Sequence, residues 1–106
     1  MTWVRTEKSN MDKRVFRHRG EFALREVGNE SVLVPIRGRV GDLDSVFTLN
    51  GVASRVWGLL DGQRPLNSIV ETICDEYEVA PEVAVADVDE LIGTLEQAHL
   101  VDRVGD

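Results

Sequence analysis

The segment LNGVASRVWGLLDGQRPLNSIV, residues 49–70, decides the fold because the spacing of apolar residues changes within it. After Leu49 the apolar positions recur every three or four residues, which is typical of one face of an amphipathic helix. These positions are Val52, Ala53, Val56, Trp57, Leu59 and Leu60. Asn50 is a suitable N-cap and Gly62 a suitable C-terminal stop, so the segment predicts a short helix between them.

Two further helices follow. Pro65 stands where a helix can begin, and the next apolar residues keep to one helical face. They are Leu66, Ile69, Val70, Ile73, Cys74 and Tyr77. Pro81-Glu82 then opens a third helix, because an acidic residue in the first turn suits the helix dipole. Its apolar face is formed by Val88, Leu91, Ile92 and Leu95, and the helix is expected to fray near His99.

Before Leu49 the apolar residues alternate with polar or smaller ones, as in strands. They are Phe22 and Leu24, then Val32, Val34 and Ile36. Gly28-Asn29 between them favours a tight turn, so two hairpin strands are predicted. Pro35 has no N–H to donate, so the second strand should end or bulge near it. A glycine-rich connection over 37–42 leads to a third strand at 44–49, which is expected to be an edge.

Three strands followed by three helices in one short chain predict an α+β fold, with a three-stranded antiparallel sheet and the helices packed on one side of it. The 106 residues suffice for one domain. Residues 1–20 show no regular period and are interpreted as a flexible basic arm whose last residues are free to join the sheet. The folded domain is expected at 21–102.

The charge is distributed unevenly. Residues 1–40 carry nine Lys or Arg against five Asp or Glu, whereas residues 41–106 carry three against fourteen. A strongly acidic C-terminal half would repel a phosphate backbone, so nucleic acid is not expected as a partner. No apolar run approaches the length of about 20 residues that spans a bilayer, and the first residues do not resemble a signal peptide. A location in the cytoplasm, away from membranes, is expected.

The residue types that carry catalysis or bind metals are scarce. His18 and His99 are expected to be solvated, and Cys74 falls on the core face of its helix, where an inert thiol is favoured. The acidic run at 87–90 has neither histidine partners nor the spacing of a calcium loop. The sequence therefore predicts no catalytic residue, no metal and no cofactor. Trp3, in the polar arm, is either incidental or a contact point for a partner.

One ordered motif resembles a known family. Leu49-Asn50-x-x-Ala53-x-x-Val56-Trp57-x-x-Leu60-Asp61-Gly62, followed by Pro65-Leu66-x-x-Ile69, is similar to the core signature of the PqqD-like family. Asp87-Val88 and Leu91 match the third helix of that family, and the resemblance covers residues 22–101. It implies a winged helix-turn-helix with three strands and three helices, in agreement with the periodicity.

The resemblance also implies a function. Members act as RiPP recognition elements, which bind the leader of a ribosomally made precursor peptide and present it to a modifying enzyme, often a radical SAM protein, as in PQQ biosynthesis. The leader adds as a strand beside the third strand and lies against the third helix. Carried over to this chain, the peptide-binding residues are Asp44, Ser45, Val46, Phe47, Thr48, Asp87, Val88, Glu90, Leu91, Ile92, Thr94 and Leu95. For Leu91, Ile92 and Leu95, ordinary core packing is the favoured alternative. The acidic rim favours a basic or neutral leader.

Two other classes of function fit a fold of this kind. A winged-helix regulator would read DNA through its third helix, but residues 81–98 contain no Lys or Arg. An adaptor that binds a folded protein would leave the same sequence pattern, because binding edges carry no catalytic signature. The exposed strand edge is also available for pairing two copies into a homodimer. The connection over 37–42 is longer than in PQQ-pathway proteins, which leaves the pathway open.

Overall fold

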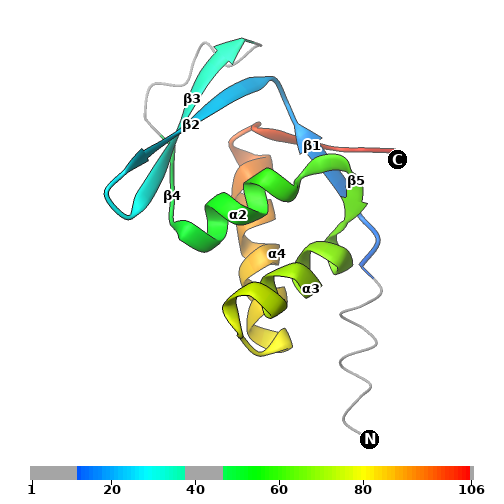
Figure 1. Ribbon diagram of the computed structural model, residues 1–106. Coiled ribbons are helices and arrows are strands. Elements are labelled where there is room, and N and C mark those ends of the chain that lie inside the picture. Colours follow the sequence, from blue (N-terminus) through cyan, green and yellow to red (C-terminus); the bar gives the residue numbers. More distant parts are fainter. Residues whose placement is uncertain (1–11, 38–46, 106) are drawn as a thin grey trace, which may run out of the picture.

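The computed structural model of the chain describes residues 12–37 and 47–105. Its elements are β1 (Val15–His18), β2 (Glu21–Val27), β3 (Glu30–Arg37), β4 (Phe47–Leu49), α2 (Gly51–Leu59), β5 (Asp61–Pro65), α3 (Leu66–Tyr77), α4 (Pro81–Gln97) and β6 (Val101–Arg103). Three helices thus follow an antiparallel sheet, as the α+β prediction requires (Figure 1). No described helix is long and apolar enough to cross a bilayer.

The predicted sheet has the order β2-β3-β4. Val27 pairs with Glu30 across the Gly28-Asn29 turn, in which Gly28 has a φ of 64°. Positive φ at the first central residue is the conformation that glycine supplies in tight hairpin turns. Near Pro35 the register shifts by one residue, which confirms the expected bulge. β4 occupies an edge of this sheet, and of the third predicted strand, residues 44–46 lie outside the described part.

The hairpin extends beyond the helices (Figure 1), so its apolar residues do not all face the core. Leu33 is 1 % exposed and packs inward, whereas Val27 and Ile36 are each 64 % exposed. Leu24 and Val34 are also exposed. The alternation of apolar residues therefore identified the two strands correctly, but only the part of the hairpin next to the helices is covered.

The helices lie close to their predicted limits. The Asn50 side chain accepts a hydrogen bond from the backbone N–H of Ala53 at 2.8 Å, which confirms it as the N-cap of α2. α3 ends at Glu78 in the left-handed conformation, and α4 begins with Pro81 at its first position. His99, with a φ of 62°, follows the end of α4, where fraying was expected.

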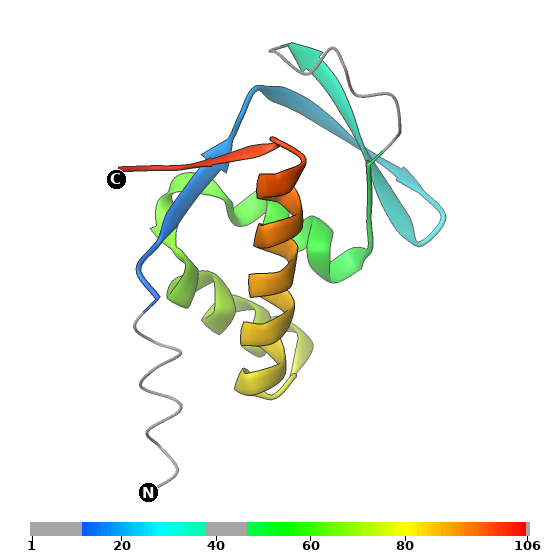
Figure 2. The same ribbon diagram turned by 180° about the vertical axis from the view of Figure 1, so that it is seen from behind.

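A second sheet, absent from the prediction, has the order β5-β1-β6. Its central strand, β1, comes from the segment assigned to the arm: Phe16 is 1 % exposed and belongs to the core. The last residues of the arm do join a sheet, but it is this one, as Figure 2 shows where β6 runs beside β1. β5 and β6 were missed because strands of three to five residues carry too short a pattern to recognise.

One hydrophobic core joins both sheets and all three helices. Its buried members include Phe16 from β1, Leu33 from β3, Trp57 from α2, Ile69 from α3 and Ile92 from α4. Because these residues are spread over the whole described chain, the position of β4 relative to α4 is held by the same core that stabilises the fold.

Candidate functional site

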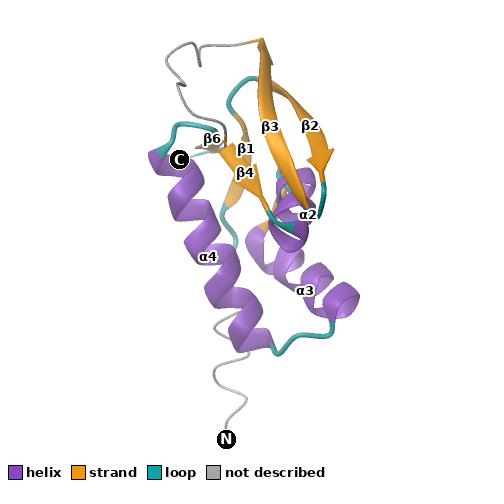
Figure 3. Ribbon diagram, turned by 90° about the vertical axis from the view of Figure 1, so that its left-hand side faces the viewer, coloured by secondary structure: helices purple, strands orange, loops and turns teal. Residues whose placement is uncertain are grey.

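A groove of about 390 Å³ lies between the edge strand β4 and helix α4. Figure 3 shows β4 between β3 and α4, so the groove runs along the side of β4 that has no strand partner among the described residues. The groove is lined by Phe47, Thr48, Leu49, Asn50, Val52, Ala53, Ile73, Val79, Ala84, Asp87, Val88, Glu90, Leu91 and Thr94. An unpaired strand edge and a concave surface therefore occupy the same place.

The local sequence explains why the groove forms. β4 passes directly into α2 through Asn50, so the strand end is fixed by the cap of the helix. α4 packs mainly on α3 and only lightly on α2, and it stands across from β4 without closing on it. A strand added to the free side of β4 would lie about 4.8 Å from it, on the side that faces α4.

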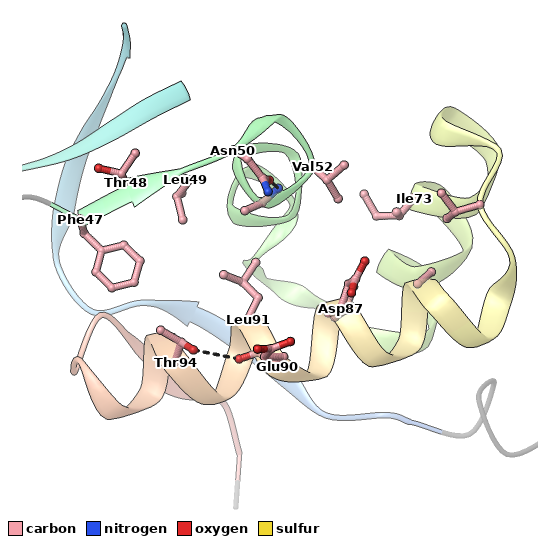
Figure 4. A pocket seen from close by; sticks show the side chains of 14 residues that line it. Phe47, Thr48, Leu49, Asn50, Val52, Ile73, Asp87, Glu90, Leu91 and Thr94 are labelled. Carbon is pink, nitrogen blue, oxygen red and sulfur yellow. Dashed lines mark hydrogen bonds between the residues drawn. The ribbon is translucent and has the colours of Figure 1, made fainter. Parts of the chain in front are cut away.

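The floor of the groove is apolar. Phe47 points from β4 toward α4 and Leu91 points from α4 toward β4, as Figure 4 shows. Both are half-buried and pack against the core, whereas Val88, which also lines the groove, is 2 % exposed. Half-buried aromatic and aliphatic side chains offer a ligand apolar surface that is still in contact with water.

The rim that α4 contributes is polar and acidic. Asp87, Glu90 and Thr94 line it, and the Thr94 hydroxyl donates to the backbone carbonyl of Glu90 at 3.1 Å (Figure 4). Asp89, one residue before Glu90, has a different role: it accepts a hydrogen bond from Arg14 at 2.9 Å and forms an ion pair with it. Among the described residues that line the groove there is no cation, so they do not balance the negative charge of the rim.

The structure brings together most of the residues that sequence reasoning assigned to a peptide site. Those that line the groove are Phe47, Thr48, Asp87, Val88, Glu90, Leu91 and Thr94. Ile92 and Leu95 are 1 % and 0 % exposed and lie in the core, as the alternative interpretation favoured. Asp44, Ser45 and Val46 lie outside the described residues. Sequence reasoning missed seven lining residues, which come from the end of β4, the start of α2, α3, the loop after α3 and the first turn of α4. They are Leu49, Asn50, Val52, Ala53, Ile73, Val79 and Ala84.

The histidine prediction was wrong for His18. Its imidazole stacks on the indole of Trp57, and its Nε2 donates to the Trp57 carbonyl at 2.8 Å. Removal from water lowers the pKa of His18, and the hydrogen bond to the Trp57 carbonyl opposes this only in part. The prediction failed because a planar imidazole gains a stacking partner only through tertiary structure. His99 is exposed, as expected.

The remaining reactive groups do not form a second site in the described part of the chain. Burial is the largest cause that raises the pKa of the Cys74 thiol, with Asp75 and Glu71 adding to it. A raised pKa disfavours the nucleophilic thiolate. Among residues 12–37 and 47–105, no three His, Cys, Asp or Glu side chains are placed to hold a metal ion.

The residues of the motif between Leu49 and Ile69 have structural roles. Asn50 caps α2, and Trp57 contacts both His18 and the edge of Phe22, whose ring centroid lies 5.3 Å away. The Asp61 carboxylate accepts hydrogen bonds from the backbone N–H groups of Gln63 and Arg64, and Gly62 has a φ of 83°. These residues maintain the path from β4 through α2 to β5 and thereby position one wall of the groove.

The comparisons with known proteins agree with this geometry. No curated protein matches the chain. Among solved structures, "TbiB1 in Complex with the TbiA(beta) Leader Peptide" is similar, with a TM-score of 0.64 and 26 % identity over 85 % of this chain and 99 % of that one. Residues 30–101 match the family described as Coenzyme PQQ synthesis protein D (PqqD). This chain therefore belongs to the PqqD family.

Proposed function

We propose that this chain is a non-catalytic RiPP recognition element, which captures the leader of a ribosomally made precursor peptide by β-strand addition and presents it to a modifying enzyme. The observation that carries the proposal is the unpaired edge of β4 beside the groove against α4. Strand addition requires such an edge for main-chain hydrogen bonds and adjacent pockets for alternate side chains.

The comparisons support this function. The similar structure of TbiB1 contains a leader peptide, and its likeness extends over most of this chain. The match to PqqD covers all the elements that form the groove, from β3 to the end of α4. Both findings support capture of a leader peptide.

The proposed contacts divide between backbone and side chains. The backbone of residues 44–48 would bond the leader, and Phe47 and Thr48 are the described part of this segment. Phe47, Val88 and Leu91 would contact apolar leader side chains, with Asp87, Glu90 and Thr94 at the polar rim. Ile92 and Leu95 would act only indirectly, by holding α4 in place.

The receiving enzyme belongs to the proposal as well. A radical SAM protein is the expected partner, in PQQ assembly or in another peptide-modification pathway, and the complex would act in the cytoplasm. Catalysis would reside entirely in that enzyme, because the described lining of the groove has no histidine, cysteine or lysine that could act on a peptide.

A titration tests the capture step. Synthetic peptides that cover the leaders of short open reading frames beside the gene are added to the ¹⁵N-labelled protein. The expected result is shifts of the amide signals of 47–49 and 87–94, with those of β1 and β6 unchanged. A scrambled peptide of the same composition is the control. Shifts confined to β1 and β6, or no binding by any leader, would contradict the proposal.

A further inference from the structure

We infer that the groove selects leaders that carry a Lys or Arg within two residues of an apolar anchor. The inference rests on the proposed function and adds a rule for the chemistry of the peptide. It comes from what α4 presents to the groove rather than from the sheet edge, because hydrogen bonds to a strand edge are independent of sequence.

The side chains that α4 contributes to the rim accept hydrogen bonds and have none to donate. Asp87 and Glu90 contribute carboxylates, which accept hydrogen bonds. The hydroxyl hydrogen of Thr94 is already donated to the Glu90 carbonyl, so this side chain too has only acceptor capacity left. Every polar side chain that α4 places along the groove therefore needs a donor from the ligand.

The two carboxylates of the rim also carry negative charge. Within the described residues Asp87 and Glu90 have no ion-pair partner, whereas the adjacent Asp89 is paired with Arg14 on a different side of α4. The only acids of α4 that face the groove are thus the ones whose charge is left uncompensated there. A Lys or Arg side chain of the leader would donate hydrogen bonds to these carboxylates and neutralise their charge. An acidic leader would be repelled.

The length of the rim limits how far apart the basic and apolar side chains of a leader can be. Along α4, Asp87 and Thr94 are about 10.5 Å apart at 1.5 Å per residue. Same-side residues of an extended peptide lie about 6.8 Å apart, so only two of them fall within this length. Phe47 and Leu91 form the apolar surface within the same stretch. A basic side chain that reaches the rim must therefore lie within about two residues of the apolar side chain that contacts Phe47 and Leu91.

A selection experiment tests the rule even while the natural leader is unidentified. An mRNA-displayed library of random peptides of about 12 residues, long enough for a strand, is selected on three proteins. They are the wild type, the double variant D87N/E90Q and the matched control E71Q/E96Q. The control removes two exposed acids of α3 and α4 that do not line the groove, so the net charge changes equally.

Wild type and control are expected to enrich Lys or Arg within two residues of an apolar residue, whereas D87N/E90Q should retain the apolar residue and lose the basic one. For one selected peptide, D87N/E90Q should weaken binding by roughly three- to tenfold, the range of two partly exposed ion pairs. The loss should shrink between about 50 mM and about 500 mM NaCl.

The outcomes separate the inference from the proposed function. If selected peptides shift the amides of 47–49 and 87–94 but show no basic preference, or show the same preference on D87N/E90Q, the inference is overturned and capture at the groove stands. If no selected peptide shifts these amides, both are overturned.

Discussion

The imidazole of His18 lies on the indole of Trp57, with ring centroids 3.7 Å apart and ring planes 6° from parallel. This contact joins the first described strand to helix α2. Burial lowers the pKa of His18 below its ordinary value of 6.5. The unfolded chain therefore takes up a proton more readily than the folded one below about pH 6.5.

The free energy of unfolding is therefore expected to decrease as the pH falls below about 6.5. Above that pH His18 is neutral in both states, and the full stability is retained. Urea unfolding followed by tryptophan fluorescence between about pH 5.5 and 7.5 measures the effect. H18Q is expected to flatten the pH dependence, and H99N, at the exposed histidine, to retain it. Equal slopes for wild type and H18Q would refute this role of His18.

Trp57 is predicted to be the most sensitive position of the quoted motif. It is 4 % exposed, stacks on His18 and contacts Phe22 edge-on. W57A should lower the free energy of unfolding by about 3–5 kcal/mol, a large part of the stability of a small domain. W57F, which retains an aromatic ring, should cost clearly less. Circular dichroism during thermal unfolding gives both values, and a W57A protein as stable as W57F would contradict the packing described.

Two glycines are predicted to respond in opposite directions. Gly62 has a φ of 83°, and a Cβ there would lie 3.4 Å from the Cβ of Arg17. G62A should therefore lower the free energy of unfolding by about 1–2 kcal/mol. Gly93 lies within α4 with open space where its Cβ would be. G93A should therefore raise the free energy of unfolding by about 0.5–1 kcal/mol. Urea denaturation of both variants checks the pair. A stabilising G62A would show that the left-handed turn is dispensable.

Leu91 and Ile92 are neighbours in sequence, but substitution of Ile92 is predicted to affect mainly folding stability and substitution of Leu91 mainly peptide affinity. Ile92 is 1 % exposed, so I92A should cost about 2–5 kcal/mol of folding stability. Leu91 is half-buried in the groove, so L91A should cost no more than about 1–2 kcal/mol. L91A should nevertheless lower the affinity for a selected peptide by roughly tenfold. Calorimetric titration at a temperature where both variants are folded measures the affinities. Unchanged peptide affinity in L91A would remove Leu91 from the proposed site.

DNA binding is predicted to be absent. The groove face of α4 is acidic, and its 17 residues include no cation. A helix of this kind cannot neutralise phosphates in a major groove. A gel-shift measurement at low salt with mixed-sequence duplexes should show no complex, with a winged-helix repressor as the positive control. A complex of any affinity in this measurement would revive the regulator hypothesis.

The helices could be predicted from sequence because each carries its own evidence: a cap at Asn50, a proline at position 81, and apolar residues at helical spacing between them. The hairpin could be predicted for the same reason, through Gly28 and Pro35. The second sheet could not be, because its strands are stabilised by one another. Phe16 shows no apolar period with its charged neighbours, and its burial depends on the core to which all three helices contribute.

The groove was partly predictable. The residues on β4 and α4 came from the family resemblance, whereas Val52, Ala53 and Ile73 look like core positions in a helical pattern and were assigned to it. Whether such a residue lines a groove or a core depends on how far α4 stands from β4. That distance is set by packing of α4 on α3, which a periodic pattern does not encode.

The pairing of β1 with β6 makes the first and last described strands immediate neighbours, and Figure 1 places β1 and β5 on the other side of the helices from β4. A unit whose outermost strands are paired can be inserted into a surface loop of a larger protein without separating its sheets. Grafting residues 12–105 into such a loop would leave the proposed leader-binding edge of β4 pointing away from the host, so the same module suits both a free-standing carrier and a built-in docking arm of an enzyme.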